Sequence, residues 1–110
     1  MIDKTISEIE AKVRAAGSVD AARKEELLTL LGRLKTEVGT LAQTHSEQAD
    51  SIAGFAQVSA HEATRKEQNP ESLEHSVAGL RSSVEDFEVS HPMLFQVVNN
   101  ISNTLANLGI

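Results

Sequence analysis

Apolar residues recur three or four positions apart over almost the whole chain, and this spacing is the feature that most constrains the fold. Such spacing places side chains on one face of an α-helix, and no segment has the period of two that strands require. Glycines, prolines and polar joints divide the pattern into four predicted helices, at about residues 2–16, 20–66, 70–89 and 91–108. The sequence therefore predicts an all-α fold, an elongated helical bundle or helical hairpin, in one domain over residues 1–110.

Residues at the predicted boundaries support these limits. Gly17 stands just past the first helix, where glycine is the usual residue. Asn69-Pro70 and Ser90-His91-Pro92 each combine a polar helix start with a proline at the first helical position, where its missing N–H is no loss. Gly109-Ile110 predicts a terminating turn after the last helix.

The segment 20–66 leaves two alternatives open. Its apolar face continues with regular spacing across two polar members, and it consists of Leu27, Leu31, Leu34, Val38, Leu41, His45, Gln48, Ile52 and Phe55. An unbroken helix over 21–66 spans about 69 Å at 1.5 Å per residue, so it needs a second chain to cover it. The alternative is a break near Gly39–Thr40 or Gly54. Because no proline interrupts the segment, we favour the unbroken helix.

Small side chains form a second pattern, at sevenfold spacing. One set comprises Ala42, Ala49, Ala56 and Ala63, and a neighbouring set comprises Gly32, Gly39, Ser46, Ala53 and Ala60. The segment 70–89 carries a stripe of Ser72, Ser76, Gly79 and Ser83. Because small residues let helix axes approach closely, we expect the segment 20–66 to pack tightly against 70–89 or against a second copy of itself.

Composition excludes several classes of function. The 110 residues include no Cys, so there is no disulfide framework, thiolate metal site or cysteine nucleophile. A net charge of −6 and only three aromatic residues argue against binding to nucleic acid. Residues 45–110 hold three basic and nine acidic residues and account for the whole net charge. This acidic face suits a basic partner or serves solubility.

The histidines suggest one alternative function, a metal or small-ligand site near His45. His45 lies on the apolar face of 20–66, where a single polar residue typically fixes helix register. In an antiparallel pair of such helices, the two His45 side chains would lie close together. A metal site needs several ligands on one face, and the sequence has no His-Glu-x-x-His motif. We predict no cofactor, and we assign His91 to the turn that starts the last helix.

Two C-terminal motifs carry a family resemblance. Phe87-Glu88-Val89-Ser90-His91-Pro92-Met93-Leu94 follows an F-x-x-S-H-P-x-L pattern, and the chain ends in Leu105-Ala106-Asn107-Leu108-Gly109-Ile110. These motifs resemble the signature of a family of small bacterial proteins catalogued as a domain of unknown function, and the segment 52–65 is similar to a subgroup with a longer central part. The resemblance implies a short N-terminal helix and a leucine-rich second helix. It implies no activity, cofactor or catalytic residue.

The last predicted helix is the main candidate for a functional surface. No residue from Met93 to Ile110 is charged, whereas an exposed helix usually carries charge on its outer face. It is either the inner helix of a monomeric bundle or a surface for self-association. We favour self-association, because amides pair across an interface without the desolvation cost of a charge. The expected interface residues are Leu94, Val98, Ile101, Leu105 and Leu108, with Asn100, Asn103 and Asn107 beside them, and His45.

These observations predict a non-enzymatic scaffold or adaptor that forms a homodimer through helix packing and binds another protein. No stretch approaches the roughly 20 apolar residues of a membrane span. Residues 1–8 interleave charged residues with isoleucine and lack the apolar run of a signal peptide. We therefore expect a cytoplasmic protein without a membrane partner.

Overall fold

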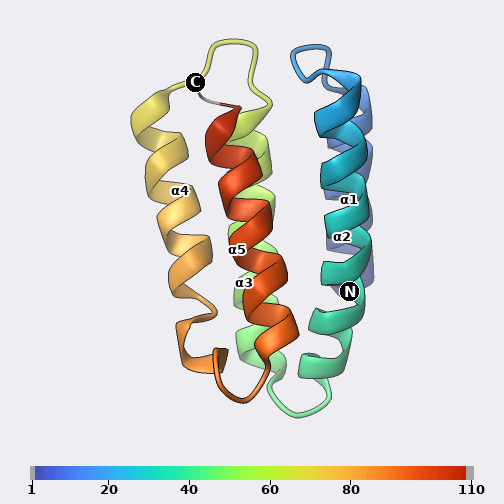
Figure 1. Cartoon of the computed structure of the whole chain (residues 1–110), viewed down its shortest axis with the longest axis vertical. Coiled ribbons are helices and arrows are strands. Elements are labelled where there is room, and N and C mark those ends of the chain that lie inside the picture. Colours follow the sequence, from blue (N-terminus) through green and yellow to red (C-terminus); the bar gives the residue numbers. More distant parts are fainter. Residues whose placement is uncertain (1, 109–110) are drawn as a thin grey trace.

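The computed structural model describes residues 2–108, and within them it contains five α-helices, one 3₁₀ turn and no strand. The elements are α1 (Ile2–Ala15), α2 (Ala21–Ala42), α3 (Ser46–Ala63), α4 (Pro70–Ser82), η1 (Glu85–Phe87) and α5 (Pro92–Asn107). The helices run alternately up and down, and short turns join them (Figure 1). This arrangement confirms the predicted all-α bundle. Gly109-Ile110, the predicted terminating turn, lies outside the described residues.

The segment 20–66 forms two helices, so the favoured unbroken helix was wrong. α2 ends at Ala42, and α3 begins at Ser46. His45 has a non-helical backbone, with φ −137° and ψ 64°, and its N–H donates to the Leu41 carbonyl at 2.8 Å. The break therefore falls at neither Gly39–Thr40 nor Gly54. Folding back lets the two halves bury their apolar faces within one chain, and the molecule measures 38 × 24 × 21 Å.

The segment 70–89 is also shorter as a helix than the spacing predicts. α4 ends at Ser82, and the chain then passes through η1 before α5 begins. Val84 and Phe87 remain on the apolar face of this segment and are buried. The 3₁₀ turn therefore keeps the inward side chains of the predicted helix while it redirects the backbone towards α5.

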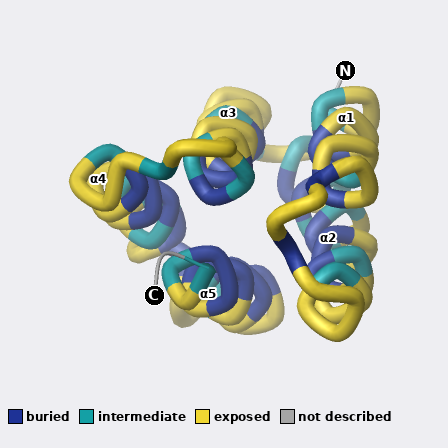
Figure 2. The backbone as a smooth tube through the Cα atoms, turned by 90° about the horizontal axis from the view of Figure 1, so that it is seen from above, coloured by how far each residue is buried: buried dark blue, intermediate teal, exposed yellow. Residues whose placement is uncertain are grey.

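The helix α3 packs against each of the other four α-helices. Figure 2 shows α3 and α5 between α4 on one side and the α1–α2 pair on the other, with buried faces turned inward. The buried face of α3 is built mostly from small residues, namely Ala49, Ala53, Ala56, Ala60 and Ala63. The predicted close packing of this alanine pattern against the segment 70–89 is therefore confirmed for α3 and α4.

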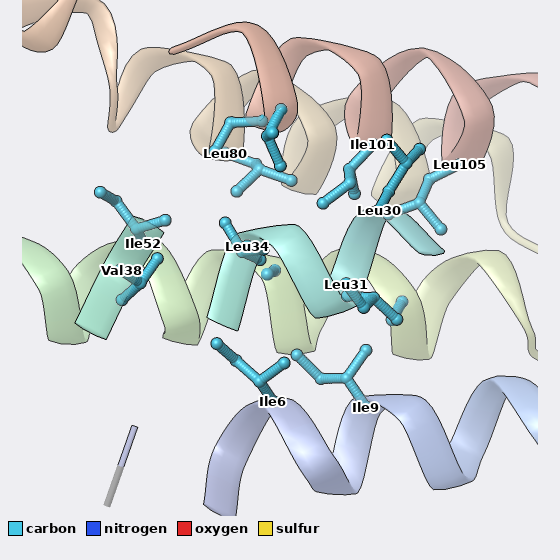
Figure 3. Packing of buried hydrophobic residues seen from close by; sticks show 14 of the residues in the cluster. Ile6, Ile9, Leu30, Leu31, Leu34, Val38, Ile52, Leu80, Ile101 and Leu105 are labelled. Atoms are coloured by element: carbon cyan, nitrogen blue, oxygen red, sulfur yellow. The ribbon is translucent and has the colours of Figure 1, made fainter. Parts of the chain in front are cut away.

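Larger side chains from the surrounding helices fill the core. Ile6 and Ile9 from α1, Leu34 from α2, Leu80 from α4 and Ile101 from α5 are each no more than 3% exposed. Figure 3 shows these side chains converging from the different helices. Burial of one such side chain contributes roughly 1.5–3 kcal/mol, so the core supplies the main stabilisation of the bundle.

Polar side chains fix the helix ends. The Asp20 carboxylate accepts a hydrogen bond from the Arg23 N–H at 2.9 Å and caps α2. The Asn69 side chain accepts hydrogen bonds from the Glu71 and Ser72 N–H groups, both at 3.1 Å. It caps α4 at the predicted helix start, where Pro70 is the first helical residue. Both contacts satisfy N–H groups that a helix start otherwise leaves unpaired.

The loss of the Asn69 cap provides a test of this boundary. Asn69→Ala is expected to lower the free energy of unfolding by about 1 kcal/mol, because the first N–H groups of α4 lose their acceptor. Urea denaturation measures the change. Asn100→Ala, at an exposed position inside α5, is the control and should stay within about 0.5 kcal/mol of the parent. Equal effects of the two substitutions would contradict the capping role.

Ser59 is the one buried polar side chain without a hydrogen-bond partner among the described residues. It lies in α3 and is fully buried. Because an unsatisfied buried hydroxyl is unfavourable, Ser59→Ala is expected to raise the free energy of unfolding by about 1 kcal/mol. The control is Ser102→Ala in α5, where the equally buried hydroxyl donates to the Val98 carbonyl at 2.8 Å. If Ser59→Ala destabilises the protein more than Ser102→Ala does, the interpretation is wrong.

Candidate functional site

The apolar stripe of α5 belongs to the core of a single chain. Leu94, Val98, Ile101 and Leu105 are at most 2% exposed, and Leu108 packs against the core while partly buried. Within this fold the stripe has no free surface to offer a second chain, so the interface expected from these residues needs correction. The physical reason is that α2, α3 and α4 all pack against α5 and cover its apolar face.

The amide residues of α5 lie on its outer face. Asn100, Asn103 and Asn107 are exposed, as is Gln96 on the same stripe. The Asn103 carbonyl oxygen accepts a hydrogen bond from the Arg81 guanidinium of α4 at 2.7 Å. The predicted stripe therefore exists as a surface, and its part in self-association stays a prediction.

Two histidine turns of the same design lie at one end of the bundle. His45 precedes α3 and His91 precedes α5, with φ −137° at both and ψ 64° and 67°. Each histidine N–H donates to the carbonyl four residues earlier at 2.8 Å. Each Nδ1 atom is hydrogen-bonded to the hydroxyl of the preceding residue, Thr44 at 2.7 Å and Ser90 at 2.9 Å.

The fold brings these two turns together around Phe87. The ring centres of His45 and His91 are 6.1 Å apart. The ring centre of Phe87 lies 5.5 Å from that of His45 and 5.4 Å from that of His91. All three pairs have edge-to-face geometry. The α2–α3 and η1–α5 turns stand at the same end of the molecule in Figure 1. His45 therefore does not lie mid-helix, as the sequence suggested, and its partner is His91 of the same chain.

Sequence reasoning assigned His91 to a turn but missed its pairing with His45. A local signal was present, because Thr44-His45 and Ser90-His91 both place a hydroxyl residue and a histidine directly before a helix. That signal predicts two similar turns. It does not predict that the turns meet, since their contact depends on how many helices lie between them.

A second candidate site is an exposed apolar surface on α3 and α4. Phe55 and Val58 are 42% and 51% exposed, although the predicted apolar face of the segment 20–66 included Phe55. The Phe55 ring rests over Gly79 of α4, where a Cβ atom would lie only 2.7 Å from the ring. Because glycine has no side chain at position 79, the Phe55 ring can lie directly against α4.

No Asp, Glu, Lys or Arg lies one helical turn from Phe55 on α3 or from Gly79 on α4. Helical spacing places Ser51 and Val58 beside Phe55 on α3. On α4 it places the small residues Ser72 and Ser83 on the same stripe as Gly79. We call this the α3–α4 surface, and its residues are Ser51, Phe55, Val58, Ser72, Gly79 and Ser83. All are exposed or half-buried. The charged Arg81 of α4 instead turns to α5, where it bonds Asn103.

Two further findings concern residues 2–108. No three or more His, Asp and Glu side chains gather closely enough there to hold a metal ion. None of the helices is both long and apolar enough to cross a membrane.

The architecture defines a small up-and-down bundle of five α-helices with an alanine-rich helix α3. The chain belongs to the family described as a domain of unknown function, DUF4404, which matches residues 2–110. No curated protein and no solved structure matches the chain.

A charge placed on the α5 stripe tests its position in the core. Ile101→Asp is expected to abolish the folded state at 25 °C, because a carboxylate is buried without a partner at a site that is 1% exposed. Circular dichroism measures the loss of helix. Asn100→Asp adds the same charge one position earlier on the exposed face and should leave the spectrum unchanged. A folded Ile101→Asp protein would contradict the assignment of Ile101 to the core.

Proposed function

We propose that this chain is a non-enzymatic scaffold or adaptor protein that self-associates through the α3–α4 surface. The observation that carries the proposal is the exposure of Phe55 and Val58 side by side on an uncharged face. Large apolar side chains exposed together favour contact with another protein, because burying them releases water from apolar area. Aromatic residues are also enriched at the centres of protein interfaces.

Charge favours a second copy of the chain as the partner at this surface. Each chain carries a net charge of −6, so two copies repel each other wherever their carboxylates face one another. The α3–α4 surface contains no carboxylate. Repulsion between two copies is therefore weaker there than at its flanks, where α3 carries Asp50 and Glu62.

The small residues of α4 support the same partner. Ser72, Gly79 and Ser83 have no bulky side chain that would hold a second helix away from the backbone. Helices that meet along small residues can approach to the short end of the 8–10 Å range of axial separations. Such an approach would let Phe55 of one copy bury its exposed edge against the other.

The amide face of α5 is the weaker candidate for the same role. Asn100, Asn103 and Asn107 are uncharged and exposed, but an exposed amide already has hydrogen-bond partners in solvent, and Asn103 also accepts from Arg81. Pairing them across an interface exchanges one set of hydrogen bonds for another, with a net gain of about 1 kcal/mol for each. Apolar burial at Phe55 and Val58 is the stronger driving force, so we place the contact there.

Analytical ultracentrifugation tests the proposal. The wild-type protein should sediment as a dimer with twice the 11.9 kDa mass of the chain. Phe55→Ser and Val58→Ser should each shift the protein to the monomer, because each removes exposed apolar area from the proposed contact. Circular dichroism establishes that the variants keep their helices, and the two substitutions lie one turn apart so that a folding defect in one leaves the other informative.

Two matched controls locate the contact. Val89→Ser changes an apolar residue that is 93% exposed in the turn between η1 and α5, and it should leave the dimer intact. Asn100→Asp adds a charge to the amide face of α5 and should also leave it intact. A wild-type mass of 11.9 kDa at high micromolar concentration would overturn the proposal, and a dimer broken only by Asn100→Asp would move the contact to α5.

A further inference from the structure

We propose that His45 and His91 form a two-imidazole site for a divalent transition-metal ion, with Cu²⁺ bound most tightly. The two histidines come from turns that are distant in the sequence and adjacent in the fold. Imidazole nitrogen suits copper, zinc and nickel, and copper binds most strongly in this series. The site has two ligands from the protein, and water completes the coordination.

The hydrogen bond at Nδ1 of His45 leaves Nε2 of that ring as the metal-binding atom. The Thr44 hydroxyl has a single proton, which it donates to the Leu41 carbonyl, with 3.4 Å between the two oxygen atoms. The Thr44 oxygen is therefore free to accept from Nδ1–H of His45, 2.7 Å away. That tautomer leaves a lone pair on Nε2. Histidines that bind metals typically have the other ring nitrogen held in this manner.

The separation of the rings is compatible with one shared ion. Metal–nitrogen bonds of about 2.0–2.1 Å place the centres of two rings that share an ion roughly 5–6.5 Å apart, depending on the angle at the metal. The ring centres of His45 and His91 are 6.1 Å apart, which corresponds to the wide end of that range.

Phe87 and two carboxylates surround the histidine pair. Phe87 is 8% exposed and contacts both rings at their edges, so it restricts their rotation. Glu47 lies two residues after His45, and Glu88 lies three residues before His91, both exposed. Their negative charge raises the local concentration of cations. It also opposes the positive ends of α3 and α5, which begin at this site.

Titration with Cu²⁺, followed by calorimetry and electron paramagnetic resonance, tests the site. The untagged wild-type protein should bind one equivalent per chain, with a nitrogen hyperfine pattern from two imidazoles and no change in mass. His45→Ala and His91→Ala should each weaken binding at least tenfold and reduce the pattern to one imidazole. Because both ligands meet only in the folded chain, one equivalent of Cu²⁺ should also raise the melting temperature.

His75→Ala is the matched control, because His75 is exposed on α4, away from the paired turns. It also leaves three of the four histidines in place, as the two test variants do. It should bind Cu²⁺ as the wild type does. Thr44→Val, which removes the hydroxyl from His45 Nδ1, should weaken binding less than His45→Ala does.

Three results would overturn the proposal. The first is equal loss of affinity in the His75, His45 and His91 variants, which would indicate independent surface histidines. The second is a single-imidazole spectrum in the wild type. The third is half an equivalent per chain with a doubled mass, which would place the ion between two copies. If an alanine variant fails to fold, the NMR spectrum of the wild type with Cu²⁺ tests the site instead. Paramagnetic broadening should then be confined to the signals of His45, His91 and their neighbours.

Discussion

The close packing of α3 against its neighbours is the interaction on which the rest of the bundle depends. Its buried face carries alanines at positions 49, 53, 56, 60 and 63, and these small side chains let α1, α2, α4 and α5 all reach it. Larger residues on the surrounding helices then fill the space between them. A bulky side chain on that face would push one neighbour outward and expose its leucines and isoleucines. The shortage of aromatic residues in the composition is therefore consistent with how this core is built.

The structure separates what local chemistry specifies from what tertiary packing decides. The starts of α4 and α5 were predictable, because Asn69-Pro70 and His91-Pro92 form helix starts by themselves. The break at residues 43–45 contains neither glycine nor proline, and the apolar spacing continues across it. Only the gain from packing the two halves of the segment against each other favours a turn there, and that gain does not appear in a local reading of the sequence.

The candidate sites were harder to predict for the same reason. The break changes the direction of α3, so its buried face passes through Ile52, Ala56 and Ser59 and leaves Phe55 outside. His45 meets His91 because α3 and α4, an antiparallel pair, return the chain to the end from which α3 started. The stripe of α5 was correctly identified as apolar and its amide face as exposed. Whether one chain or two would cover that stripe depended on the turn at residues 43–45.

The order in which the helices pack also has a consequence for how the chain folds. Each helix contacts the next one in the sequence, and such local contacts form quickly, because little chain entropy is lost in closing the short connections between them. The contact between α2 and α5 is different, since two helices lie between them in the chain. It includes a hydrogen bond from the Thr104 hydroxyl to the Glu26 carboxylate, at 3.0 Å across 78 positions. The kinetic barrier is therefore expected to lie in the docking of α5 onto α2, which closes the bundle after the hairpins have formed.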